Sequence, residues 1–211
     1  MRNDKTNKTA QCYDKMLKKE PFLDWQSITD PILTEYQIEL WVRYAPAPNP
    51  DISGNKLLKL KYQLEQSLQL NSKGLLTFGG AFSNHLIATA AAAAQYNLKS
   101  IGIVRGSEVD LANPSLALCQ QYGMHLIRVS REQYQRRHDA EYVQQLSADY
   151  AGYFLIPEGG SCEAATLGIS ELDMKQTPAG PATLIVSAVG SGGTIAGLVR
   201  GAADTQVLGL K

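Results

Sequence analysis

A glycine-rich segment late in the chain has the residue types that bind an anion. Ser187–Thr194 (SAVGSGGT) follows an apolar run and precedes a helical pattern, and backbone amides without side chains can converge on a phosphate at a helix N-terminus. The spacing differs from that of a dinucleotide loop, because Ile195 stands where the third glycine belongs, and no lysine follows Gly197 as a nucleotide-triphosphate loop requires. A tight structural turn explains this segment equally well.

A second loop, Thr77–His85 (TFGGAFSNH), brings a hydroxyl, an amide and an imidazole together in the sequence. It lies between an expected strand and an expected helix, at the carboxyl end of the strand, where α/β proteins bind ligands. A simpler explanation is that Ser83 or Asn84 only caps the helix.

A lysine and a third loop complete the set of candidate groups. Lys56 lies at the start of a helical pattern, in Ser53–Lys56 (SGNK), where a lysine is usually solvated. Pro157–Ser161 (PEGGS) again follows a strand and precedes a helix. Together the four segments supply an amine, a phosphate cradle, a polar cap and glycine-lined strand ends. An aldehyde cofactor that carries a phosphate needs these groups, and pyridoxal phosphate meets that description.

The elements that must position these groups alternate along the chain. Apolar runs predict strands at Leu75–Phe78, Ile101–Val104, Leu126–Val129, Tyr153–Ile156, Thr183–Val189 and Val207–Leu210. Helices are expected near residues 84–96, 114–122, 132–148, 163–175 and 194–202. Repeated alternation of strand and helix implies parallel sheets with helices on both faces, so the predicted fold class is α/β.

The segment before the Thr77–His85 loop contains an expected strand, a loop and an expected helix. Ile38–Tyr44 alternates with a period of two, which predicts a strand with Ile38, Leu40 and Val42 on one face. The three prolines of Ala45–Pro50 predict a loop. Beyond it, an apolar stripe predicts an amphipathic helix that begins close to Lys56. The stripe is formed by Leu57, Leu60, Leu64 and Leu68.

Composition excludes several function classes. The 211-residue chain has no net charge, with 20 Lys+Arg against 20 Asp+Glu, and 44% of its residues are hydrophobic. This excludes disorder for most of the chain and gives no general attraction to nucleic acid or to anionic membranes. The short basic cluster Arg136–His138 is interpreted as a solvated helix face. The longest apolar stretch, Leu86–Ala94, is well short of the roughly 20 residues that a membrane helix needs.

The N-terminal region and the cysteines indicate a cytosolic protein. The first 20 residues are polar and charged, so no secretory signal is expected. Cys12, Cys119 and Cys162 are far apart in the sequence, which indicates neither a disulfide framework nor a zinc cluster. We therefore expect free thiols and no metal site.

The four segments resemble, in order and approximate spacing, those of the 1-aminocyclopropane-1-carboxylate deaminase and D-cysteine desulfhydrase family, whose members use pyridoxal phosphate. They are Ser53–Leu60 (SGNKLLKL), Thr77–His85 with the alanine-rich helix after it, Pro157–Ser161, and Val189–Leu198 (VGSGGTIAGL). The resemblance covers roughly Ile38 to Leu210. It implies a two-lobed tryptophan synthase β-like fold, which is pyridoxal-phosphate fold type II.

The resemblance also implies roles for individual residues. Lys56 would bind the cofactor covalently and later move the α- or β-proton of the substrate. Asn84 would hydrogen-bond the phenolic oxygen of the cofactor, and Ser83, with nearby backbone amides, would receive the substrate carboxylate and lie near the attacked carbon. The phosphate would bind Gly190, Ser191, Gly192, Gly193 and Thr194. The substrate subsite would comprise Gly80, Ser83, Asn84 and His85, with Glu158 and Ser161 shaping its wall.

The chain departs from the family pattern at two places. Val42–Pro46 replaces the K-R-D-D-like run that usually follows the first strand. Family catalytic domains also continue past the glycine loop, where they supply the group that faces the pyridine nitrogen, so the C-terminal part of the larger lobe is expected to be missing. The expected larger lobe comprises residues 1–56 and 166–211, and the smaller lobe residues 57–165.

The leading hypothesis is a cytosolic pyridoxal-phosphate-dependent deaminase or lyase. Its substrate would be a small amino acid, 1-aminocyclopropane-1-carboxylate or D-cysteine, and its products ammonia and a 2-oxo acid. The alternative is a truncated, non-catalytic relative that binds a phosphate or amino-acid ligand or acts as a partner subunit. A nucleotide-binding α/β domain is a third hypothesis, although the acidic ribose contact of such domains is missing. The family resemblance also implies a homodimer.

Overall fold

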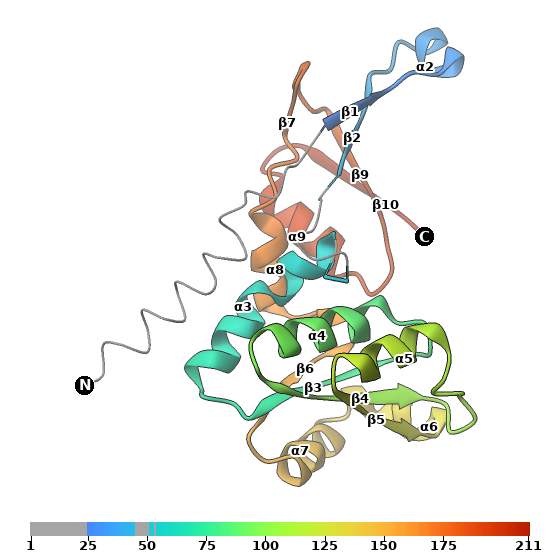
Figure 1. Cartoon of the computed structure of the whole chain (residues 1–211). Helices are drawn as coiled ribbons and strands as arrows, with labels where there is room; N and C mark the ends of the chain where they lie inside the picture. Colours follow the sequence, from blue (N-terminus) through green and yellow to red (C-terminus); the bar gives the residue numbers. More distant parts are fainter. Residues whose placement is uncertain (1–24, 45–50, 53) are drawn as a thin grey trace.

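The computed structural model describes residues 25–44, 51–52 and 54–211 (Figure 1). The predicted proline-containing loop Ala45–Pro50, Ser53 and Cys12 lie outside these residues. Within the described ranges no helix is long and apolar enough to cross a membrane. The same ranges contain no group of three or more His, Cys, Asp or Glu side chains that could hold a metal ion.

A four-stranded parallel sheet lies in the lower half of Figure 1. Its spatial order is β5 (Met124–Val129), β4 (Lys99–Arg105), β3 (Gly74–Gly79) and β6 (Tyr153–Ile156). The strands are connected through α4 (Asn84–Gln95), α5 (Pro114–Gln121) and α7 (Ala140–Asp149). Parallel pairing with helical crossovers confirms the predicted α/β class.

The two faces of this sheet have separate apolar cores. Leu75 packs with the leucines of α3 (Asn55–Gln69) and the alanines of α4, whereas Leu76, one residue later, packs with Tyr142 and Leu146 of α7. Successive strand side chains point to opposite faces, which explains why adjacent leucines belong to different cores. Figure 1 shows α4 and α5 on one side of the sheet and α7 on the other.

A second parallel pair follows in the chain. β9 (Leu184–Ala188) pairs with β10 (Gln206–Leu210), and α9 (Gly193–Gly201) crosses between them. α8 (Glu163–Ser170) packs against both α3 and α9. The packing with α3 is close, since a Cβ on Gly168 would lie 2.0 Å from the carbonyl oxygen of Leu58. These contacts place the N-terminal ends of α3 and α9 beside each other.

The first described residues form a hairpin. β1 (Trp25–Ile28) pairs antiparallel with β2 (Leu40–Arg43), and α2 (Pro31–Glu35) lies between them in the chain. The strand predicted over residues 38–44 is therefore confirmed in its centre only. Ile38 precedes β2 and is 54% exposed, so it does not share a buried strand face.

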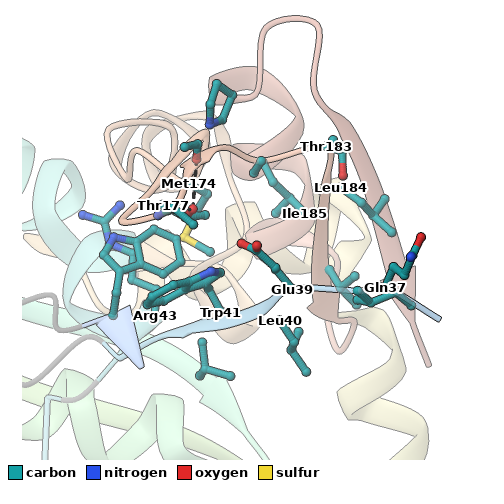
Figure 2. A pocket seen from close by; sticks show the side chains of 18 residues that line it. Gln37, Glu39, Leu40, Trp41, Arg43, Met174, Thr177, Thr183, Leu184 and Ile185 are labelled. Carbon is teal, nitrogen blue, oxygen red and sulfur yellow. Dashed lines mark hydrogen bonds between the residues drawn. The ribbon is translucent and has the colours of Figure 1, made fainter. Parts of the chain in front are cut away.

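A cavity of about 700 Å³ lies between this hairpin and β9. Figure 2 shows Trp41 and Arg43 of β2 on one side of it and Ile185 of β9 on another. The two short strands β7 (Gln176–Thr177) and β8 (Gly180–Pro181) contribute further lining residues. No lining residue of this cavity belongs to the four predicted site segments within the described chain.

The helix predicted over residues 132–148 is divided. α6 (Arg131–Gln135) is followed by the single turn η1 (Arg136–His138), and α7 then starts with Asp139 as its N-cap, which accepts a hydrogen bond from the Glu141 amide at 3.0 Å. The predicted solvated face is right for Arg136, whose side chain is 51% exposed. It is wrong for Arg137, which is 22% exposed and ion-paired with Glu158. The helix predicted to reach residue 175 ends earlier, at Ser170.

Candidate functional site

Lys56 lies in the first turn of α3, facing the start of α9. The chain enters α3 through Gly54, whose φ of 57° is favourable only for glycine. Lys56 Nζ donates a hydrogen bond to Asn55 Oδ1 at 3.3 Å, and Asn55 Nδ2 donates to Thr194 Oγ1 at 2.7 Å. Two segments 139 residues apart in the chain are thereby joined. The predicted lysine and the predicted glycine loop therefore belong to one site.

The glycine loop forms one wall of a small cavity of about 180 Å³. Gly192, with φ 83°, is the N-cap of α9, so the free amides at the start of that helix lie at the cavity. Helix N-termini of this kind attract anions. The lining residues are Asn55, Lys56, Lys59, Ala188, Val189, Gly190, Ser191, Gly192, Thr194 and Ile195.

Lys59 is a further cation in this cavity, and the sequence analysis missed it. Its side chain is 2% exposed, and Nζ donates to the Gly159 carbonyl at 3.1 Å and to Ser191 Oγ at 3.4 Å. Lys59 follows Lys56 by three residues, the spacing that places two side chains on one helix face. That spacing is the signal that could have identified it.

Burial shifts the acid–base equilibria of both lysines. It lowers the pKa of Lys56 below the usual value for a lysine. For Lys59, burial together with the charge of Lys56 lowers the pKa to about 8. Lys59 is thus mostly protonated at neutral pH, while its partners are a carbonyl and a hydroxyl rather than a carboxylate. A buried ammonium without a counter-charge favours the binding of an anion.

Glycine at position 193 keeps open the space beside Lys59. A Cβ there would lie 3.0 Å from Lys59 Nζ and 2.9 Å from Ser161 Oγ. Ser161 Oγ in turn lies 2.7 Å from Ser191 Oγ, which joins the Pro157–Ser161 segment to the glycine loop. A glycine cradle, a helix N-terminus and a buried ammonium therefore converge, and they fit a phosphate group.

The Thr77–His85 loop lies at the end of β3, next to this region. Ser83 is the N-cap of α4 and accepts a hydrogen bond from the Leu86 amide at 3.3 Å, so the predicted capping is confirmed. Asn84 is the first residue of α4 and is exposed. Gly80 precedes the cap in the same loop. These three residues thus lie at the carboxyl edge of the sheet, as predicted.

His85 is placed differently from its neighbours, because it is buried and only 3% exposed. Its Nε2 lies 2.9 Å from Thr77 Oγ1, and Thr77 donates its hydroxyl proton to the Ile156 carbonyl at 2.8 Å. His85 Nε2–H must then donate to Thr77. Burial, with the charges of Lys56 and Lys59, lowers the pKa of His85 to about 3. His85 is therefore neutral at physiological pH and links β3 to β6 through Thr77.

The titration of Lys59 predicts a pH dependence of anion binding. We expect the affinity of the chain for inorganic sulfate to fall as pH rises through about 8, because Lys59 loses its proton there. Sulfate keeps its charge over this pH range, so a change in affinity reflects the titration of a group on the protein. Isothermal titration calorimetry at pH 7 and pH 9.5 measures it. Lys59→Met should bind sulfate weakly at both pH values, and an unchanged affinity of the wild-type chain at pH 9.5 would contradict the assignment.

Comparison with family models finds one that covers most of this chain. The model described as "Pyridoxal-phosphate dependent enzyme" matches residues 33–209. That range includes Lys56, the Thr77–His85 loop, Pro157–Ser161 and the glycine loop.

Curated relatives and solved structures agree with this match. A Thermotoga maritima protein provisionally named 1-aminocyclopropane-1-carboxylate deaminase is 39% identical over 154 residues, which are 71% of this chain and 49% of the relative. The mitochondrial bifunctional D-cysteine desulfhydrase/1-aminocyclopropane-1-carboxylate deaminase of Arabidopsis thaliana is 31% identical over 180 residues, covering 77% of this chain and 45% of the relative. The chain spans about half the length of these curated relatives.

The solved structure of an ACC deaminase homologue superposes with a TM-score of 0.66 at 24% sequence identity. The superposition covers 93% of this chain and 64% of the other. This similarity confirms the predicted fold type.

Proposed function

Because this chain belongs to the family of pyridoxal-phosphate dependent enzymes, we propose that it binds pyridoxal 5'-phosphate and serves a deaminase or lyase reaction on a small amino acid. The observation that carries the proposal is the joining of Lys56, through Asn55 and Thr194, to a glycine loop that also holds a buried ammonium. This arrangement supplies a reactive amine and a phosphate cradle in one cavity.

The cofactor's phosphate would bind the amides at the start of α9, the hydroxyls of Ser191 and Thr194, and the ammonium of Lys59. Gly190, Gly192 and Gly193 leave room for it, since a Cβ on Gly193 would enter the space beside Lys59 Nζ. Asn84, exposed at the start of α4, would hydrogen-bond the phenolic oxygen. When bound, the cofactor supplies an electron sink that stabilises negative charge at the substrate carbon.

Lys56 has two tasks in this proposal. Its Nζ holds the cofactor covalently, which requires an unprotonated amine, and burial favours that form by lowering the pKa. Lys56 Nζ would also accept and return the proton at the α- or β-carbon of the substrate. An amine with a lowered pKa is suited to both directions of proton transfer.

The loop after β3 would bind the substrate. Ser83 and the backbone of Gly80 would receive the carboxylate, and Ser83 would lie near the attacked carbon. His85 acts as a positioning residue, because it is buried and neutral and fixes the first turn of α4 against β3 and β6. Glu158 and Ser161 would shape the wall of the site, and Ser161 Oγ lies 2.7 Å from Ser191 Oγ of the glycine loop.

The substrate class is supported by the names of the relatives. They indicate 1-aminocyclopropane-1-carboxylate or D-cysteine. The products would be ammonia and a 2-oxo acid, with sulfide in addition for D-cysteine. We also propose a cytosolic location, supported by the free thiols Cys119 and Cys162. A homodimer and the division into lobes of residues 57–165 and 1–56 with 166–211 are further proposals that rest on the family.

Turnover by the 211-residue chain tests this function. The cofactor-loaded chain is incubated separately with 1-aminocyclopropane-1-carboxylate, D-cysteine and L-cysteine, and 2-oxo acids, ammonia and sulfide are quantified. We expect 2-oxo acid from one of the first two substrates, and Lys56→Ala should form none. Cofactor binding at Lys56 with no product from any of the three amino acids would support the non-catalytic alternative instead.

A further inference from the structure

An arginine lies beside the loop proposed to bind the substrate. Arg105 is the last residue of β4, the strand paired with β3, and it is exposed. Its Nη2 lies 3.7 Å from the position that a Cβ on Gly80 would take. Because Gly80 has no side chain, the guanidinium stands directly over the backbone of the loop that leads to Ser83.

The orientation of Arg105 is supported by a fixed aromatic ring. Its Cζ lies 5.9 Å from the centroid of the Tyr134 ring. Tyr134 is 1% exposed and packs edge-to-face on Phe78 at a centroid distance of 6.2 Å. A guanidinium held over such a ring loses less conformational entropy on ligand binding than a freely rotating arginine does.

Within the residues that the structure describes, the guanidinium of Arg105 has no carboxylate partner. Tyr134 contacts a second guanidinium, that of Arg137, at 4.8 Å from the ring centroid. Arg137 Nε donates to Glu158 Oε2 at 2.6 Å, and the Tyr134 hydroxyl donates to Oε1 of the same carboxylate at 2.6 Å. One oxygen of Glu158 thus accepts from Arg137 and the other from Tyr134. No carboxylate in the described chain forms an ion pair with Arg105.

We propose that Arg105 binds the carboxylate of the amino-acid substrate, together with the loop Gly80–Ser83. The inference rests on the proposed function, since it names the residue that selects for the substrate's acid group. A guanidinium matches a carboxylate with two parallel hydrogen bonds, which a lysine or an uncharged donor cannot provide. Arg105 supplies the positive charge of this subsite, and Ser83 and the backbone amides supply its neutral donors.

The experiment measures amino-acid binding to the cofactor-loaded chain through the change in its visible absorption spectrum. Arg105→Gln should raise the apparent dissociation constant for D- or L-alanine by about 10- to 100-fold, the effect of removing one charge-assisted contact. Alaninamide, which lacks the carboxylate, should bind Arg105→Gln and wild type equally. Arg128→Gln is the matched control, because Arg128 is an exposed arginine on the neighbouring β5 whose guanidinium donates to the Val109 carbonyl at 3.2 Å. Arg105→Lys should recover part of the affinity.

Each outcome decides a different claim. If Arg105→Gln binds alanine as wild type does, or weakens alanine and alaninamide alike, the inference is overturned while the proposed function stands. Cofactor loading of every variant is checked first by reduction and mass measurement. A wild-type chain that fails to load the cofactor would overturn the proposed function and this inference with it.

Discussion

Replacing Lys56 with alanine should abolish the covalent attachment of pyridoxal phosphate to this chain. Lys56 is the partly buried amine that faces the glycine loop, and burial lowers its pKa toward the reactive, unprotonated form. Wild-type chain that is loaded with the cofactor and reduced with borohydride should gain one cofactor mass, whereas Lys56→Ala should gain none. Intact-protein mass spectrometry and the visible spectrum before reduction measure both states.

Lys73→Ala is the matched control for this prediction. Lys73 is an exposed lysine directly before β3, at the opposite end of that strand from the Thr77–His85 loop, and its Nζ donates to the Ala151 carbonyl at 3.2 Å. Lys73→Ala should bind pyridoxal phosphate covalently to the same extent as the wild-type chain. Full labelling of Lys56→Ala at the wild-type stoichiometry would refute the role of Lys56, because another lysine would then carry the cofactor.

Lys59→Met should lower the affinity for pyridoxal phosphate by about 10- to 100-fold, through loss of one charge-assisted contact to the phosphate. Its ammonium is buried, protonated at neutral pH, and directed at Gly159 and Ser191. Methionine keeps the length and the apolar stem of the side chain while removing the charge. Equilibrium titration of the cofactor, followed by absorbance, measures the affinity.

Titration with pyridoxal, which lacks the phosphate, distinguishes the loss of a phosphate contact from damage to the fold of the site. Its weaker binding should be nearly the same in wild type and Lys59→Met, since the group that Lys59 contacts is absent. An equal loss of affinity for pyridoxal and pyridoxal phosphate would show that Lys59 acts on the fold of the site rather than on the phosphate. Lys61→Met is a suitable control, because Lys61 pairs with Glu171 outside the cavity.

Most of the architecture could be predicted from local patterns. The alternation of apolar runs and helical stripes located the four strands of the central sheet, because buried parallel strands are short and almost wholly apolar. It also located β9 and β10, which are apolar although most of their residues are not buried. The start of α3 was also predicted close to Lys56, where it begins at Asn55. The glycine loop was found because its spacing leaves several amides without neighbouring side chains.

The features that were not predicted depend on contacts between distant residues. The three-residue spacing from Lys56 places Lys59 on the same helix face, but its burial depends on Gly159 and Ser191, which lie 100 and 132 residues away in the sequence. The ion pair of Arg137 could not be predicted for the same reason, since its partner Glu158 lies 21 residues away in the sequence. The break between α6 and α7 was missed for a local reason: Asp139 caps a new helix inside a stretch that otherwise has helical composition.

The candidate site was predicted in its parts, and the structure adds their arrangement. Lys56 and Gly190–Thr194 lie in one cavity, Ser83 caps α4 beside it, and His85 is buried rather than open to a substrate. Burial of His85 could not be inferred from the sequence, because an imidazole in the first turn of a helix is compatible with either environment.

The most direct test of the central claim is the position of the cofactor on the chain. Pyridoxal phosphate is added to residues 1–211, reduced with borohydride, and located by fragmentation of the labelled peptides in a mass spectrometer. Fragmentation must separate Lys56 from Lys59, which lie three residues apart in the sequence. We predict a label on Lys56 alone. A label on Lys59, or labels spread over exposed lysines such as Lys73, would contradict the site described here.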